Sequence, residues 1–409
     1  MWLSLEAHNS APGITAKQKK PCGALRRWMG PGMTANGEIG SRVRVARKAM
    51  GLRQTDLSEM TELPASHLSD IERGALTPTI PTLRKIGDAL GRPLVYFLQA
   101  AEDNPRSVGM VINISSIGGQ AAVRFAELVE EKTGGDHKVH IYDHSRLGTA
   151  RQQIEGLAEG AIDIYIDELL GYEGYAELCG PVCLPFFFRD EDHYRAFLQS
   201  EIFEEHIYQR LLEKGIRLLK PVSSWGSGSF EMLLSTDPIF SPSDLANRRL
   251  RSYDSPAAIA LRRALNAEPV VVEWADAPQA FMEGRIDTFL TPAIYLNALR
   301  PNEFARNATL LAYGYTLGLT VAVNDRAYRS MSPGLQSALT ESAQEAGAYC
   351  TPLVNEQTTF TLERLPTEYG LPVIHPDRHA WRQSFDAAIR RICEEGLLSP
   401  EMYASIQSL

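Results

Sequence analysis

Small and polar residues dominate one face of the stretch QTDLSEMTELPASHLSDIERGALTPT, residues 54–79. The apolar residues between them recur at helical spacing and predict two short helices joined by a tight turn. In that geometry the second helix lies in a DNA major groove and reaches base edges, while the first braces against the backbone. The outward positions of the second helix are Ala65, Ser66, His67, Ser69 and Asp70. Gln54 begins the first helix, where its side chain and backbone amide could hold a phosphate.

No pattern of catalytic residues accompanies this face. The chain has no Ser-His-Asp order, no H-E-x-x-H and no phosphate loop, and its nine His residues are scattered. Cys179 and Cys183 in CGPVC could be read as a metal pair, but no His or Cys partner stands nearby at ligand spacing. A strand followed by a loop would separate His137, His140 and His144. We expect no catalytic residues, no metal site and no cofactor.

These polar residues need a helical segment to position them, and the pattern of residues 36–101 predicts such a segment. Its first helix has apolar residues three or four apart, and Gly51 should end it. Thr55 and Thr79 are predicted to cap two later helices, and Gly74 to end the helix between them. Five small helices in this segment predict a compact all-α domain.

The segments on either side have a different character. Residues 1–35 mix Gly, Pro, Ser and Lys without a helical or strand period and predict a flexible basic arm. Residues 102–107 are polar, contain Pro105 and predict a linker. From residue 108 to residue 409 strand patterns alternate with amphipathic helices, as in VGMVINIS followed by GGQAAVRFAELVEEKTGG. This alternation favours an α/β domain with parallel strands.

Charge and composition agree with this division. The 409 residues carry a net charge of −9 and enough apolar residues for two or three globular domains. Lys and Arg outnumber Asp and Glu up to residue 100 and are outnumbered after it, so phosphate contact is expected at one end only. No run of about 18 apolar residues predicts a membrane span. The N-terminus lacks a secretory pattern and the five cysteines suit reduced thiols, so we expect a cytosolic protein.

The helical segment resembles a known DNA-binding family. GSRVRVARKAMGLRQTDLSEMTELPASHLSDIERGALTPTIPTLRKIGDALGRPL is similar to the XRE-type helix-turn-helix family of lambda and Cro-like repressors. The residues that carry the resemblance are Arg47, Gly51, Leu52, Gln54, Leu57, Ser69, Ile71, Glu72, Gly74, Pro78, Leu83 and Leu90. It implies that Arg53 and Gln54 contact phosphates. It also implies that Ala65, Ser66 and Asp70 face the bases.

The same resemblance makes Glu72 and Arg73 structural residues. Asp70 is an unusual base-facing residue, because an acidic group near phosphates weakens binding unless it accepts a hydrogen bond from a cytosine amino group. The alternative to a DNA reader is a helical protein–protein module that keeps this fold.

Several blocks of the body resemble the solute-binding proteins of TRAP transporters, the dicarboxylate-type periplasmic receptors. These blocks are AAVRFAELVEEKTGGDHKVHIYDHSRLGTARQQIEGLAEGAIDI, LPFFFRDEDHYRAFLQSEIFEEHIYQRLLEKGIRLL, IFSPSDLANRRLRSYDSPAAIALRRALNAEPVVVEWADAPQAFMEGRIDTFLTP and LTVAVNDRAYRSMSPGLQSALTESAQEAG. The resemblance implies a periplasmic-binding-protein-like domain whose two α/β lobes close on a small organic acid. The fold expected for the whole chain is therefore multidomain, with a small all-α bundle before this domain.

The resemblance also assigns a ligand-binding arginine. Arg251, at the end of RRLRS, stands where the family keeps the arginine that pairs with the ligand carboxylate. A guanidinium fork matches a carboxylate with two parallel, charge-assisted hydrogen bonds. Arg248 and Arg249 are expected to be solvated.

Other positions are candidates for the same site. Thr291 stands where the family commonly has an asparagine, and its hydroxyl could bond a ligand oxygen. Trp225 either stacks on the ligand or fills core. Glu168 either accepts from a ligand hydroxyl or amine or is simply exposed. Ser115 and Ser116 precede a helix start, where free amides attract anions. Possible walls of the site are Tyr172, Tyr295 and Tyr313.

Two departures from the family pattern concern the ligand. Where many relatives have a second arginine, this chain reads GSGSFEML, with Phe230 and Glu231, and where relatives often read DGxENP it has DTFLTP. Fewer charged groups suggest a less polar ligand, such as a monocarboxylate with an apolar or aromatic part.

A DNA-binding head on a solute-binding body predicts a one-component transcription regulator. The body would sense a cytosolic acid, and a homodimer would place two heads on double-stranded operator DNA, because paired half-sites lie about one helical turn apart. The alternatives are a cytosolic transport accessory protein without an operator and an enzyme acting on a small carboxylate. A gel shift separates the first from a regulator, and a turnover assay would reveal the second.

Overall fold

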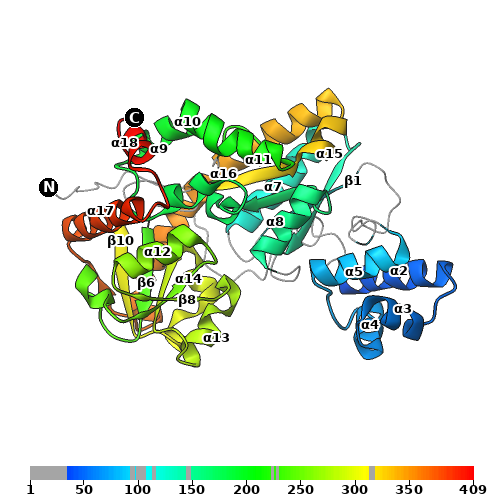
Figure 1. The fold of residues 1–409 in the computed structure, drawn as a ribbon, viewed down its shortest axis with the longest axis horizontal. Coiled ribbons are helices and arrows are strands. Elements are labelled where there is room, and N and C mark those ends of the chain that lie inside the picture. Colours follow the sequence, from blue (N-terminus) through cyan, green and yellow to red (C-terminus); the bar gives the residue numbers. More distant parts are fainter. Residues whose placement is uncertain are drawn as a thin grey trace, which may run out of the picture.

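The computed structural model describes residues 35–92, 97, 107–112, 117–143, 149–222, 225–226, 230–312 and 318–409. The arm predicted over residues 1–35 and the linker predicted over residues 102–107 lie outside these ranges, except for Ala35 and Ser107. Figure 1 shows a small helical bundle next to a larger body in which helices surround two sheets. This is the predicted order of an all-α bundle and an α/β domain.

Among the described residues, the bundle consists of α2 (Ala35–Ala49), α3 (Gln54–Thr61), α4 (Ala65–Glu72) and α5 (Ile80–Leu90). Each helix turns an apolar stripe inward. The residues buried completely are Val43, Leu57, Leu68, Ile71, Leu83 and Ile86. Beyond α5, Phe97 is buried against the same core.

Glycine ends the helices as expected. Gly51 and Gly74 have φ values of 69° and 71°, a region that side chains with a Cβ rarely adopt. The cap predicted at Thr79 is confirmed, because its hydroxyl accepts from the Thr82 N–H.

The cap predicted at Thr55 is wrong. Helix α3 begins at Gln54 and its N-cap is Arg53. The Arg53 N–H donates to Asp56 Oδ2 at 2.7 Å, so the carboxylate at the third helical position fixes the start of the helix earlier than the threonine would.

Lobe 1 is built on a mixed sheet with the order β2-β1-β3-β11-β4, and β5 pairs with β11. Its strands are β1 (Ser107–Ile112), β2 (Lys138–Asp143), β3 (Ile164–Asp167), β4 (Ile216–Leu218), β5 (Trp225–Gly226) and β11 (Gly318–Asn324). β1 is parallel to β2 and β3, as predicted. β11 is antiparallel to β3 and β4, because it returns to this sheet after the chain has built the other lobe.

Helices cover both faces of the lobe 1 sheet. Ile164 and Ile166 of β3 pack in one hydrophobic cluster with α7 (Ile117–Lys132), and Tyr165 packs in another with α8 (Ala150–Glu159). This alternation along one strand places the two clusters on opposite faces. Shorter elements complete the lobe, namely η3 (Leu169–Tyr172), η4 (Glu177–Cys179), η5 (Pro181–Cys183), α9 (Glu191–Leu198), α10 (Glu201–Phe203), η6 (Glu204–Tyr208), α11 (Gln209–Glu213) and α15 (Asp325–Ser330).

Lobe 2 has a sheet with the order β12-β10-β6-β9-β7-β8. Its strands are β6 (Phe230–Ser235), β7 (Arg249–Ser252), β8 (Glu268–Val271), β9 (Thr288–Pro292), β10 (Asn307–Ala312) and β12 (Val373–Ile374). β7 is parallel to β8 and β9, whereas β6 is antiparallel to β9 and β10. The remaining elements are η7 (Pro242–Leu245), α12 (Pro256–Ala264), η8 (Trp274–Asp276), α13 (Ala277–Met282), η9 (Ala293–Tyr295), α14 (Leu296–Leu299) and η10 (Pro301–Glu303).

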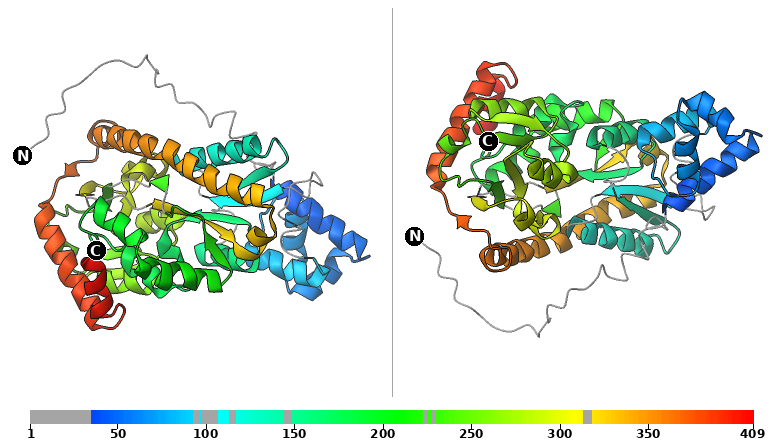
Figure 2. Two further views of the ribbon diagram at one scale, coloured as in Figure 1. Left: turned by 90° about the horizontal axis from the view of Figure 1, so that it is seen from above. Right: turned by 90° about the horizontal axis from the view of Figure 1, so that it is seen from below.

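A single long helix, α16 (Pro333–Glu368), joins the lobes. It contacts α7 in lobe 1 and η9 in lobe 2, and Figure 2 shows it running along one side of the body. Pro352 and Pro366 lie inside it. The chain ends with α17 (Arg378–Glu394), which packs on α12 of lobe 2, and α18 (Pro400–Gln407).

Candidate functional site

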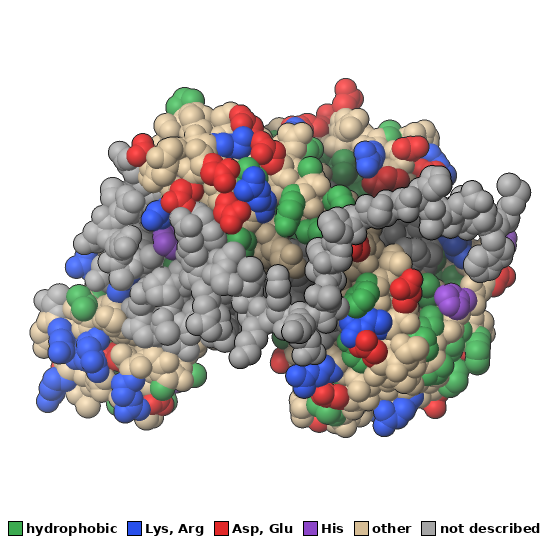
Figure 3. Space-filling view, turned by 180° about the vertical axis from the view of Figure 1, so that it is seen from behind, with side chains coloured by type: hydrophobic (Ala, Val, Ile, Leu, Met, Phe, Trp, Pro, Cys, Tyr) green, Lys and Arg blue, Asp and Glu red, His purple; other side chains and the backbone are tan. Residues whose placement is uncertain are grey.

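The predicted DNA-reading helix is α4, and its polar residues lie on the surface. Leu68 and Ile71 are buried in the bundle. Ser66 is exposed, and four others are half-buried, namely Ala65, His67, Ser69 and Asp70. Figure 3 shows Lys and Arg side chains gathered on the outer surface of the bundle. The arrangement suits a phosphate backbone, which attracts positive charge whatever the base sequence.

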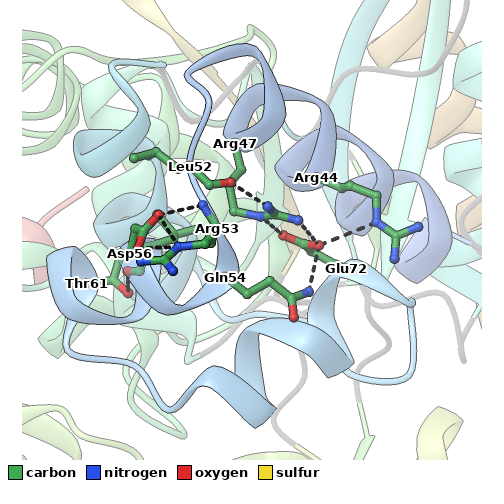
Figure 4. A network of polar contacts seen from close by, with 9 residues as sticks. Arg44, Arg47, Leu52, Arg53, Gln54, Asp56, Thr61 and Glu72 are labelled. Atoms are coloured by element: carbon green, nitrogen blue, oxygen red, sulfur yellow. Dashed lines mark hydrogen bonds and ion pairs between the residues drawn. The ribbon is translucent and has the colours of Figure 1, made fainter.

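A buried carboxylate fixes α4 to the neighbouring helices. Glu72 accepts hydrogen bonds from Arg47 Nε at 2.5 Å, Arg47 Nη2 at 2.8 Å and Gln54 Nε2 at 2.8 Å (Figure 4). Arg44 Nε adds a contact at 3.4 Å. Burial alone would raise the pKa of Glu72, but the hydrogen bonds from Arg47, Gln54 and Arg44 outweigh it and lower the pKa. Glu72 therefore stays ionised and sets the angle between α4 and α2.

The predicted phosphate contacts begin helix α3. The side-chain amide of Gln54 is held by Glu72, and Arg53 is exposed, with an ion pair of 2.8 Å to Asp56. The hydrogen bond from Arg53 lowers the pKa of Asp56. Asp70, the unusual acidic residue of the reading face, pairs with Arg73 one turn later, which offsets its charge near a phosphate.

Arg251 lies at the centre of the candidate ligand site. Its residue is 2% exposed on β7, and its Nε donates to the Val272 carbonyl at 2.9 Å. The guanidinium carbon is 4.0 Å from the ring centroid of Tyr253 and 5.7 Å from that of Phe289. Its Nη1 is buried and has no hydrogen-bond partner among the described residues. A buried cationic donor of this kind is stabilised by an anionic acceptor.

The charge of Arg251 acts on Glu168, and the charge of Glu231 acts on the same carboxyl group. Glu168 follows β3 in lobe 1, whereas Glu231 lies on β6 in lobe 2. Burial first, and then the charges of Asp167 and Glu231, raise the pKa of Glu168 to about 8, and the charge of Arg251 opposes this. Tyr253 belongs to the same group. Burial raises its pKa to about 12, against the charge of Arg251. Charged groups of both lobes therefore lie close enough to affect one another's pKa.

Two other predicted ligand contacts, Thr291 and Trp225, are buried and form hydrogen bonds within the protein. Thr291 is fully buried on β9 and accepts from Trp274 Nε1 at 3.3 Å. Trp225 is also fully buried, and its Nε1 donates to the Ala343 carbonyl at 2.8 Å while its ring meets Phe125 edge-on. These contacts fit the core-filling alternative for Trp225.

The remaining candidates are partly or completely buried, or lie outside the described residues. Ser115, Ser116 and Tyr313 fall in residues that the structure does not describe. Tyr172 is completely buried, and Tyr295 is half-buried with its ring edge-on to Trp274.

Sequence reasoning missed Tyr253 and Trp274. Tyr253 is two residues beyond Arg251 and directly follows β7, so strand periodicity places both side chains on the same side of the chain and would have found it. Trp274 follows a half-exposed strand and gives no comparable signal.

The described residues contain no group of three His, Cys, Asp or Glu side chains arranged to hold a metal ion. Cys179, Cys183, Cys350 and Cys393 are free thiols, and burial raises the pKa of each. None of the helices in the described ranges has the length and apolarity needed to cross a membrane.

Two α/β lobes that meet at a buried, incompletely bonded arginine define a two-lobed ligand-binding protein, which here follows a helix-turn-helix bundle. The chain belongs to the bacterial extracellular solute-binding proteins, family 7, whose sequence model matches residues 108–396. Residues 43–97 match the helix-turn-helix family of XRE type. Neither family is a family of enzymes, and the relatives found are binding proteins.

Curated relatives agree with the assignment of residues 108–396. The chain is 28% identical over 271 residues to the 2,3-diketo-L-gulonate-binding periplasmic protein YiaO of Escherichia coli, covering 66% of this chain and 81% of that protein. It is 26% identical over 274 residues to the C4-dicarboxylate-binding periplasmic protein DctP of Rhodobacter capsulatus, covering 65% and 79%.

A solved structure shows the same fold. The TRAP periplasmic solute-binding protein of Sulfurospirillum deleyianum, with bound succinate, superposes with a TM-score of 0.65 at 20% identity and covers 74% of this chain and 98% of that chain.

Proposed function

We propose that the chain is a one-component transcriptional regulator that binds operator DNA through α4 and senses a small organic acid where its two lobes meet. The two families that it combines support each half. The carboxylate-binding relatives, together with the succinate in the Sulfurospirillum structure, support an acid as the ligand.

The observation that carries the proposal is the position of helix α8. At its beginning, Arg151 forms an ion pair of 2.6 Å with Asp254 of lobe 2, three residues beyond Arg251. At its end, Glu159 pairs with Arg84 of helix α5 in the DNA-binding bundle. One helix therefore contacts both the lobe that would hold the acid and the bundle that would hold the DNA.

Coupling between the sites requires that the acid favour one arrangement of the lobes. A ligand shifts a conformational equilibrium only through different affinities for the two states, and the effect between the sites is reciprocal. An acid bridging the lobes would bind the closed arrangement better. DNA would then bind that arrangement with a different affinity.

The proposal includes a cytosolic location and a homodimer. A helix-turn-helix domain acts where DNA is, which supports the location. Operators with two half-sites require two bundles, which supports the dimer.

The test is a mobility shift of the full chain on DNA from upstream of its own gene, with and without candidate acids. We expect specific binding whose affinity changes with the acid. A double variant, Ser66→Ala with Asp70→Ala, should alter the preferred DNA sequence and leave acid binding unchanged. Acid binding without any specific DNA binding would instead identify a solute-binding accessory protein.

A further inference from the structure

The first turn of helix α12 in lobe 2 is capped from lobe 1. Pro256 begins the helix and has no N–H, so the next two donors, those of Ala257 and Ala258, need acceptors. The Ser255 hydroxyl accepts from the Ala258 N–H at 3.0 Å within the same turn. The Ala257 N–H instead donates to Oε1 of Glu173 at 3.1 Å. Glu173 lies 84 positions earlier in the chain and directly follows η3 of lobe 1.

The carboxylate of Glu173 fits closely between the two lobes. Gly180 is buried beside it, and a Cβ at position 180 would overlap the carboxyl group of Glu173. Oε2 of Glu173 is buried and has no hydrogen-bond partner among the described residues. Burial raises the pKa of Glu173, and hydrogen bonds from Ser255 and the Ala257 N–H oppose the rise. The positive end of α12 is therefore the favourable partner of this carboxylate.

A second contact between the lobes involves the same segment of lobe 2. Arg151 of α8 forms an ion pair of 2.6 Å with Asp254. Both side chains of this pair are exposed, so solvent screens it, whereas Ala257 is completely buried. The two contacts hold one short segment, residues 254–257, against lobe 1. This segment connects β7, which carries Arg251, to helix α12.

On the basis of the proposed function, we propose that Glu173 is a positioning residue that holds lobe 2 against lobe 1 and thereby raises the acid affinity of the site at Arg251. Its hydrogen bond to Ala257 exists only while the first turn of α12 lies against lobe 1. The bond therefore favours this arrangement of the lobes even without acid. The acid then has to supply less of the free energy of closure, which strengthens its apparent binding.

A cap with a purely structural role would behave differently. It would stabilise α12 and have no influence on the distance between the lobes. Loss of Glu173 would then lower the melting temperature and leave the lobes in place. The distance between the lobes is therefore the quantity that separates a positioning residue from an ordinary helix cap.

The test measures distances by pulsed electron paramagnetic resonance on the full chain, without acid or DNA. Spin labels are placed at Lys214 of lobe 1 and Ala275 of lobe 2, both exposed, through a non-canonical keto amino acid that leaves the cysteines unlabelled. A second label pair, at Asp136 and Ala275, detects a rotation of the lobes that does not alter the first distance. In Glu173→Ala we expect the distance distribution of at least one pair to shift or broaden relative to the parent.

Gly180→Ala tests the same contact without altering Glu173. Its methyl group displaces the carboxylate from α12 and should change the distances in the same sense as Glu173→Ala. Arg151→Ala should have a smaller effect, because its ion pair is exposed. Glu177→Ala removes an exposed glutamate of lobe 1; it is the matched control and should leave both distributions unchanged.

The proposal is overturned if Glu173→Ala or Gly180→Ala, folded as judged by circular dichroism, gives the distances of the parent. Because the measurement contains neither acid nor DNA, its outcome does not depend on the regulator. Unchanged distances refute the role of Glu173 alone, whereas a chain without specific DNA binding refutes the regulator alone.

Discussion

Arg251 is held by three neighbours that leave one of its nitrogen atoms for a ligand. Val272 accepts from Nε, and the rings of Tyr253 and Phe289 lie beside the guanidinium group. Because these contacts fix the plane of the fork before any ligand arrives, binding loses little side-chain entropy. A lysine would supply the charge without the fork.

Removing this fork should abolish acid sensing. In Arg251→Ala we expect the ligand-induced rise in melting temperature to disappear and basal DNA binding to remain. Arg249→Ala is the control, since Arg249 is exposed on the same strand and pairs with Asp287. Differential scanning fluorimetry measures both variants, and an unchanged thermal shift in Arg251→Ala would refute the assignment.

Glu168 should make stability depend on pH. Its folded-state pKa is about 8, above the ordinary 4.5. A carboxyl group with a raised pKa costs nothing below its unfolded pKa, and its cost grows until the pH reaches the folded pKa. Glu168→Gln removes this cost, so the variant should melt a few degrees higher than the parent at pH 8.5 and equally at pH 4.5. A difference that is constant over this range would contradict the raised pKa.

Helix α4 depends on the Glu72 network more than on its own length. A helix of eight residues is marginal in water, and Glu72 connects it to α2 and α3 through Arg47 and Gln54. The exposed pair of Arg53 and Asp56 contributes much less, because solvent screens it.

Arg47→Ala should therefore destabilise the bundle selectively. It leaves Glu72 buried without its main partner, a loss on the order of 3 kcal/mol. Hydrogen exchange should accelerate in α2 to α4 and stay unchanged in the β11 strand of lobe 1. Arg53→Ala should have little effect on exchange, and equal protection in both variants would show that the network does not hold the bundle.

Sequence reasoning succeeded where local patterns determine structure. The helical periodicity of the bundle, the glycines that end its helices and the cap at Thr79 are all found in the structure. It failed where contacts between distant segments of the chain determine the structure. No local signal shows that β11 returns antiparallel to lobe 1, that Trp225 donates to Ala343, or that Glu168 and Glu231 come together from different lobes.

At the scale of the whole molecule, α8 is the element through which the body meets the bundle. Its two ion pairs, Arg151 with Asp254 and Glu159 with Arg84, lie at opposite ends. Both pairs are substantially exposed, so each adds little to the free energy of unfolding. They can nevertheless set the position of the bundle, because a lobe movement transmitted along a rigid helix changes both contacts at once.

Reversing the charge of Arg84, at the bundle end of α8, should weaken the effect of the acid on DNA affinity and leave acid binding unchanged. Arg84→Glu places like charges opposite each other and should reduce the acid-induced change in DNA affinity roughly threefold, which corresponds to one exposed ion pair. Acid affinity in the absence of DNA should stay the same, since Arg251 and Glu168 are untouched. Fluorescence anisotropy of labelled operator DNA, with and without saturating acid, measures the response.

A double variant that restores the ion pair with its two charges exchanged provides the control. In the double variant Arg84→Glu with Glu159→Arg, attraction returns and the response should recover, whereas Glu159→Arg alone should resemble the first single variant. Lys85→Glu changes the charge of the adjacent, exposed residue of α5 and should leave the response intact. If both single variants respond to the acid like the parent, the signal does not pass through this end of α8, because opposed charges there would have moved the bundle.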